Sequence, residues 1–234
     1  MLNIQSINPS AKSPCRWKLP YLKKQLAESR NVPFIALTET WLKPYVTDAM
    51  VDIEGYNVFR CDRSTRVGGG VLLYCQENLP ITNVQMYDDK TCQALLCTCD
   101  ISKSVICVVY RPPDCTEQSF KSCLSFVSDY LDSTSDEFEL NILGDFNFPR
   151  VQWSSQTILP GGSDAEQRCT RLFFDFMSDH LCSQIITEPT RKESTLDLYL
   201  SNSEELVTHF SVAQHRCLIM SLLKCIGHIT LAIL

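Results

Sequence analysis

The chain has 234 residues, of which 44% are hydrophobic and 21% are charged, so it can bury a sizeable core without disulfides or metals. These values exclude a disordered chain and a small disulfide-stabilised module. The net charge of −6 excludes a protein that coats nucleic acid through bulk positive charge.

Short apolar runs alternate with amphipathic stretches along the chain. In chain order, the patterns predict strands at residues 2–7, 33–38, 56–60, 69–75, 93–99, 105–110, 139–144 and 195–200. They predict helices at residues 17–29, 116–132 and 164–181. Strands interspersed with helices indicate an α/β or α+β sandwich.

The apolar residues 217–234 contain Lys224 and His228 and number only 18, so we expect a core strand or a poorly fitting tail rather than a membrane span. The thirteen cysteines include no Cys-x-x-Cys pair, which argues against a structural zinc site. The N-terminus has no apolar signal segment. We therefore expect reduced thiols and an intracellular protein, nuclear or cytoplasmic.

Polar side chains stand at the ends of several predicted strands. Asp145 and Asn147 directly follow the strand at 139–144, where α/β sheets bind their ligands. Taken alone, this pair also fits an ordinary turn, because Asp and Asn bond readily to nearby backbone. Tyr110 and Arg111 end another strand before two prolines, where a phenol and a guanidinium suit a phosphate, or form an ordinary strand exit.

Three more strands each carry one polar residue. Glu39 follows the strand at 33–38, where it either caps a helix or acts as an oxygen ligand for Mg²⁺. Asn3 and Asp197 lie inside apolar strand-like runs, and a strand does not bury such groups without partners. A shared site explains these separate strands better than random placement.

The ordered motifs resemble the endonuclease/exonuclease/phosphatase family, and within it the apurinic-type endonuclease domain of non-LTR (LINE-type) retrotransposons. The resemblance runs through roughly residues 2–202 and rests on these segments: Asn3, LTETWL at 37–42, GGGVLLY at 68–74, VVYRPP at 108–113, ILGDFN at 142–147 and TLDLYLSN at 195–202. It implies a four-layer α/β sandwich, with two facing mixed β-sheets flanked by helices. It also implies a metal site at one end of the sandwich, with Mg²⁺ or Mn²⁺ as the cofactor.

The resemblance also implies a role for each matching residue. Glu39 and Asn3 match the metal-binding pair, and Tyr110 matches the tyrosine near the scissile phosphate. Asp145 matches the aspartate that activates the attacking water, and Asn147, beside it, has an orienting role. Asp197 matches the carboxylate that steadies a catalytic histidine. We further expect Arg111 and Thr190 to contact the DNA.

The family closes with a Ser-Asp-His motif after the strand that bears Asp197. Here Ser178-Asp179-His180 precedes that strand and lies on an amphipathic helical pattern, so we interpret it as a coincidence on a helix surface. The segment in the expected place offers His215, preceded by Gln214 where an aspartate is expected. Glutamine has no anionic form and is a poor substitute for a carboxylate. We therefore expect an endonuclease domain at 1–212 and a divergent apolar tail at 213–234, which is either separate from that domain or an altered end of it.

The resulting hypothesis is a metal-dependent endonuclease of retrotransposon type that nicks DNA, without an attached reverse transcriptase. DNA is the expected substrate, with no membrane and no obligate protein partner. Two alternatives stay open. The chain is otherwise a catalytically impaired remnant of the domain, as Gln214 suggests, or a phosphoesterase of the same superfamily that acts on small substrates.

Overall fold

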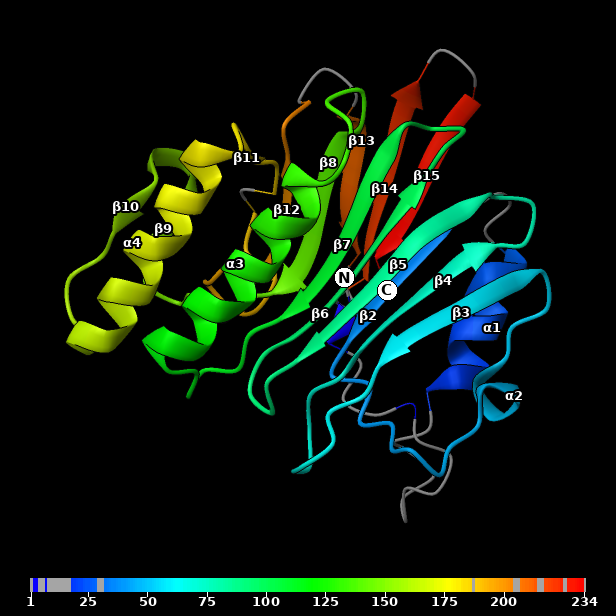
Figure 1. The fold of residues 1–234 in the computed structure, drawn as a ribbon, viewed down its shortest axis with the longest axis horizontal. Helices are drawn as coiled ribbons and strands as arrows, with labels where there is room; N and C mark the ends of the chain where they lie inside the picture. Colours follow the sequence, from blue (N-terminus) through cyan, green and yellow to red (C-terminus); the bar gives the residue numbers. More distant parts are fainter. Residues whose placement is uncertain are drawn as a thin grey trace.

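A computed structural model describes residues 2–3, 7, 18–28, 32–186, 188–203, 207–213, 217–224 and 227–233. For residues 2–3, 21, 25–28 and those after 203 it describes the backbone alone. Two β-sheets face each other, and helices cover their outer faces (Figure 1). This confirms the predicted α/β sandwich with two facing mixed sheets flanked by helices.

The first sheet has the strand order β13-β14-β15-β2-β4-β3, and β1 pairs with β2. Its parallel pairs are β1–β2 and β15–β2, and the others are antiparallel. The strand bounds are β1 (Leu2–Asn3), β2 (Phe34–Thr38), β3 (Tyr56–Cys61), β4 (Val71–Gln76), β13 (Val207–Ala213), β14 (Cys217–Lys224) and β15 (Gly227–Ile233).

The second sheet has the strand order β11-β12-β8-β7-β6-β5, in which only the β7–β8 pair is parallel. Its bounds are β5 (Ile81–Asp88), β6 (Gln93–Cys99), β7 (Ser104–Tyr110), β8 (Glu139–Asp145), β11 (Ser183–Gln184) and β12 (Asp197–Ser201). A short hairpin pairs β9 (Val151–Gln152) with β10 (Thr157–Ile158), separated by a 3₁₀ turn at Trp153–Ser155.

The helices form the outer layers. Of these, α1 (Leu19–Glu28) and α2 (Asp48–Val51) cover the first sheet, whereas α3 (Glu117–Asp132) and α4 (Asp164–Asp179) cover the second (Figure 1). Apolar side chains fill all three interfaces: helix to sheet, sheet to sheet, and sheet to helix. An aromatic cluster around Phe173 of α4, with Phe146, Phe148 and Trp153, packs α4 against the loop that follows β8.

From residue 17 onward, the predicted strands and long helices occur close to their expected bounds, whereas the strand predicted at 2–7 is described only as β1, Leu2–Asn3. The prediction missed the strands β5 and β13, the two-residue strands β9, β10 and β11, and the single-turn helix α2. Within the apolar segment 217–234, the structure places β14 and β15 in the first sheet; the expected domain boundary after residue 212 stays a prediction. Cys75, Cys97 and Cys107 are fully buried in strands, where they pack as small apolar side chains. Among the described residues, no helix is long and apolar enough to cross a bilayer.

A glycine-rich loop, Gly68–Gly70, connects β3 to β4. All three glycines have positive φ angles, of 89°, 73° and 87°, which disfavour residues with a side chain. A Cβ atom on Gly69 would lie 2.8 Å from Oε1 of Gln93 and 2.9 Å from Cδ of Arg63. This loop therefore needs glycine both for its conformation and for its close packing.

We predict that Gly69→Ala destabilises the protein more than Gly55→Ala. Gly55 also has a positive φ, of 83°, but a Cβ there would meet nothing within 4 Å. Backbone strain alone costs roughly 1–2 kcal/mol, and overpacking adds about 1–3 kcal/mol at Gly69. Urea unfolding of the two variants gives the comparison, and equal losses in the free energy of unfolding would contradict the packing argument.

Candidate active site

A row of polar side chains crosses the second sheet at one register. Asp197 of β12 pairs with Asp145 of β8, and Asp145 pairs with Tyr110 of β7. Side chains at one register point to the same face of a sheet. Two residues along, Leu143 and Tyr199 lie in the core between the sheets, so the polar row also faces the first sheet. We call the end of the sandwich that carries this row the site end.

Glu39 enters the site end from the first sheet, directly after β2. Its φ of 56° turns the chain sharply at the strand end. Its Oε2 atom accepts hydrogen bonds from the indole Nε1 of Trp41, at 2.5 Å, and from the backbone N–H of Gly69, at 2.9 Å. The helix-capping alternative for Glu39 is wrong, because the next helix, α2, begins only at Asp48.

Tyr110, on the second sheet, interacts with Glu39 at the end of a strand of the first sheet. Burial raises the pKa of Tyr110 above its ordinary value, and the negative charges of Glu39 and Asp145 and a hydrogen bond with Glu39 raise it further. The guanidinium of Arg63, whose central carbon lies 5.7 Å from the ring centroid, opposes this shift. The hydroxyl therefore stays protonated at neutral pH and serves as a hydrogen-bond donor between carboxylates.

Two buried polar residues, Arg63 and Gln93, support the glycine-rich loop. Arg63 is 3% exposed and donates to the carbonyl oxygens of Lys90 and Thr91, at 3.2 and 2.5 Å. Gln93 lies opposite Tyr110 in the sheet register, and its Oε1 accepts from the N–H of Gly70 at 3.2 Å. The sequence analysis did not single out Gln93, although a glutamine in an otherwise apolar strand was an available signal.

Further contacts fix the loop that precedes the glycines. Lys43 donates through Nζ to the carbonyl oxygens of Arg63 and Arg66, at 3.2 and 2.7 Å. Arg66 forms a two-pronged ion pair with Asp114, at 2.6 and 2.8 Å, and this hydrogen bonding lowers the pKa of Asp114. Loops from both sheets are thereby joined at the site end.

The segment after β8 places Asp145 and Asn147 differently. Asp145 is 2% exposed at the end of the strand, and Asn147 has a φ of 51°. The amide Nδ2 of Asn147 donates at 2.9 Å to the carbonyl oxygen of Arg111, at the exit of the neighbouring strand. A purely local turn therefore does not account for Asn147. The Arg111 side chain is buried, at 2% exposure, and contacts protein groups.

Thr190 lies beside the chain that enters β12. Its Oγ1 atom accepts hydrogen bonds from the backbone N–H groups of Leu196 and Asp197, at 3.0 and 3.1 Å. This arrangement holds the start of the strand at the position where Asp197 joins the polar row. The contact with DNA that we expected for Thr190 stays a prediction.

Of two expected site residues, the structure describes only the backbone of Asn3 and no part of His215. Asn3 pairs in register with Thr38 of β2, one residue before Glu39, but its side chain lies outside the described parts of the chain. His215 and Gln214 lie wholly outside the described residues. Their assigned roles stay predictions.

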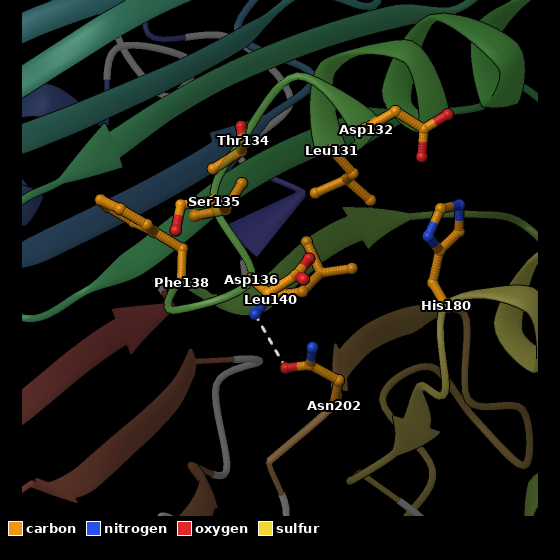
Figure 2. Close-up of a pocket in the computed structure, with 10 residues that line it drawn as sticks. Leu131, Asp132, Thr134, Ser135, Asp136, Phe138, Leu140, His180 and Asn202 are labelled. Atoms are coloured by element: carbon orange, nitrogen blue, oxygen red, sulfur yellow. Dashed lines mark hydrogen bonds between the residues drawn. The ribbon is translucent and has the colours of Figure 1, made fainter.

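Ser178-Asp179-His180 lies at the far end of the second sheet. These residues end α4, and His180 lines a cavity of about 440 Å³ together with Asn202 and Leu140 (Figure 2). Oδ1 of Asn202 accepts from the N–H of Leu140 at 2.8 Å, near the start of β8. From Leu140 in the cavity wall to Asp145, strand β8 spans roughly 17 Å, at about 3.3 Å per residue. The interpretation of this motif as a coincidence agrees with its position.

Comparisons with known proteins agree with this architecture. Residues 104–221 match the sequence profile of a family described as endonuclease-reverse transcriptase. The sequence has no match among curated proteins.

Solved structures share the fold at low sequence identity. The 3′ phosphatase NExo from Neisseria, bound to a product DNA hairpin, has a TM-score of 0.61 and 15% identity, covering 91% of this chain and 90% of that one. The endonuclease domain of TRAS1, a telomere-specific non-LTR retrotransposon, has a TM-score of 0.52 and 14% identity, covering 85% of both chains. An endonuclease/exonuclease/phosphatase family protein from Bacteroides thetaiotaomicron has a TM-score of 0.56 and 10% identity, covering 91% of this chain and 83% of that one.

The matched profile spans half of the chain and includes Tyr110, Asp145 and Asp197, the residues of the polar row. The likeness to solved structures extends over both sheets. The chain therefore belongs to the endonuclease/exonuclease/phosphatase family.

Proposed function

We propose that this protein is a metal-dependent endonuclease of retrotransposon type that hydrolyses a phosphodiester bond of DNA. The single observation that carries the proposal is the common register of Tyr110, Asp145 and Asp197, opposite Glu39 on the facing sheet. These groups supply a proton acceptor, a hydrogen-bond donor and an oxygen ligand at one point. Each of the three can accelerate the hydrolysis of a phosphate ester.

Each described residue has a distinct task in this proposal. Asp145 accepts the proton of the water that attacks phosphorus. Tyr110, kept protonated by its surroundings, donates to a phosphoryl oxygen. Asn147 orients groups beside Asp145 from its fixed turn. Asp197 is placed to orient a histidine, a role for which His215 is the predicted partner.

A magnesium ion fits the oxygen donors at the site end. Mg²⁺ is usually held by one or two carboxylates and keeps several waters. Trp41 and Gly69 both donate to Oε2 of Glu39, which fixes the orientation of the carboxylate. The buried Oγ1 of Thr38 nearby has no hydrogen-bond partner. The described residues include no cluster of three His, Cys, Asp or Glu that could hold a metal, so Glu39 would act with water and, as predicted, Asn3.

Bound at Glu39, the ion would neutralise charge that develops on the phosphoryl oxygens. Mn²⁺ offers the same oxygen-directed chemistry. Glu39 itself is oriented by protein groups alone, so its carboxylate is aimed before any cation arrives.

Two of the structurally similar proteins support DNA as the substrate class. One is the endonuclease domain of a non-LTR retrotransposon, and the other is a 3′ phosphatase bound to a DNA hairpin. We extend this substrate class to the present chain as part of the proposal, with an intracellular site of action and no obligate protein partner.

We predict that the purified chain nicks supercoiled plasmid with Mg²⁺ and not with EDTA. Asp145→Ala lowers the nicking rate by about 10²-fold or more, because a general base typically contributes 10²–10⁴-fold. Glu39→Gln raises the Mg²⁺ concentration needed for half-maximal rate, because it removes the ligand charge. Gel analysis of open-circular product over time gives both values.

The outcome also separates the alternatives. Folded protein that binds DNA and never nicks it would identify a catalytically impaired remnant. Release of phosphate from small phosphoesters without plasmid nicking would identify a small-substrate phosphoesterase.

We predict that Asp197→Asn lowers the nicking rate and that His180→Ala does not. Asp197→Asn lowers the rate at least about 10-fold, because the neutral amide orients an imidazole less well. His180→Ala leaves the rate within about twofold, because His180 lies at the far end of the sheet. A large loss with His180→Ala and none with Asp197→Asn would place the chemistry at the other motif.

A further inference from the structure

Arg111 follows Tyr110 at the exit of β7, yet its side chain is buried. Its residual exposure is 2%, and its guanidinium carbon lies 4.4 Å from the ring centroid of Phe148 and 5.2 Å from that of Phe120. Both rings belong to the aromatic core under α3 and α4. A guanidinium enclosed by aromatic rings is poorly placed to contact a DNA backbone.

Arg111 instead brackets the segment Asp145–Asn147. Its backbone N–H donates to the carbonyl oxygen of Asp145 at 2.9 Å, and its carbonyl oxygen accepts from Nδ2 of Asn147 at 2.9 Å. From the other side, its Nη1 donates to the carbonyl oxygens of Phe146 and Asn147, at 2.9 and 3.3 Å. Arg111 thus bonds to every residue of the segment Asp145–Asn147, which contains the proposed proton acceptor Asp145.

The bracketed turn depends on such support. Asn147 has a φ of 51°, which non-glycine residues adopt at a cost. At Gly144 a Cβ would lie 2.4 Å from the carbonyl oxygen of Val109 and 2.6 Å from Cε2 of Phe146, so the turn packs directly on β7. Close packing fixes one side of the turn, and Arg111 fixes the other.

The charge of Arg111 has no ion-pair partner among the described residues. Asp114 and Glu117 line the same cavity as Arg111, but they pair with Arg66 and Arg168. Burying an unpaired charge is costly unless other groups stabilise it. Here two carbonyl oxygens and two ring faces do so.

We propose that Arg111 is a positioning residue that fixes Asp145 and Asn147 for hydrolysis, rather than a contact to DNA. The proposal rests on the proposed function. It replaces the expectation, drawn from the sequence, that Arg111 contacts the substrate. Arg111 acts through the turn and does not touch the reacting atoms.

The test compares Arg111→Met with Arg60→Met, a matched loss of a largely buried arginine whose guanidinium faces Val46 and Asp48 beside α2. Arg60 bonds to the carbonyl oxygen of Val46 at 2.5 Å and pairs with Asp48 and Asp62. Hydrogen exchange of the peptide covering 142–149 is measured first, since it needs no activity. Steady-state nicking and the salt dependence of DNA binding in EDTA follow.

We expect Arg111→Met to speed exchange in 142–149 and to lower kcat about 10²-fold, because small misplacements of catalytic groups have effects of that size. The KM and the slope of log K against log salt stay at parental values. Arg60→Met leaves the exchange of 142–149 and kcat unchanged. Arg111→Lys gives an intermediate kcat, because lysine keeps the charge but lacks the planar fork.

Three results would overturn the proposal. A salt slope smaller by about one, with weaker binding, would make Arg111 a phosphate contact. Equal losses of kcat in both methionine variants would make its role generally structural. Unchanged hydrogen exchange in 142–149 would show that Arg111 does not fix this segment, and this result counts even if the parent chain never nicks DNA. If Arg111→Met does not fold, the same readouts on Arg111→Lys decide.

Discussion

The register of three neighbouring strands is the constraint on which the site depends. Asp197, Asp145 and Tyr110 stand opposite one another on β12, β8 and β7, and all face the other sheet. A slip of one residue in either pairing would turn a carboxylate toward the helices and an apolar side chain toward the site. The apolar residues between the sheets, such as Leu143 and Tyr199, therefore fix the register that brings the polar groups together.

The site end also shows how a protein holds several carboxylates close together. Burial raises the pKa of Tyr110, and Glu39 and Asp145 raise it further, so the phenol stays protonated. Arg63 and Arg111 are buried on either side, the first beside the tyrosine ring and the second behind the turn at Asp145–Asn147. Backbone groups complete the arrangement, since Gly69 orients Glu39 and the N–H groups before β12 bond to Thr190.

The sequence predicts the elements better than their contacts. Apolar runs locate β2, β6, β7, β8 and β12, because burial imposes a pattern that is visible locally. The strand β5 was missed because it lies at a sheet edge, where half-exposed residues weaken the pattern. The hydrogen bonds that join Arg111 and Thr190 to protein backbone were not predicted from the sequence. The carbonyl partners of Arg111 lie 35 and 36 residues away, so no local pattern reveals them.

The most direct test of the central claim is a crystal structure of the protein soaked with Mn²⁺, with the ion located by its anomalous scattering. The account predicts one strong peak within coordination distance of the Glu39 carboxylate, at the end of the sandwich that carries Tyr110 and Asp145. A peak only in the cavity beside Asp132, Asp136 and His180, or none at Glu39 under saturating Mn²⁺, would contradict it.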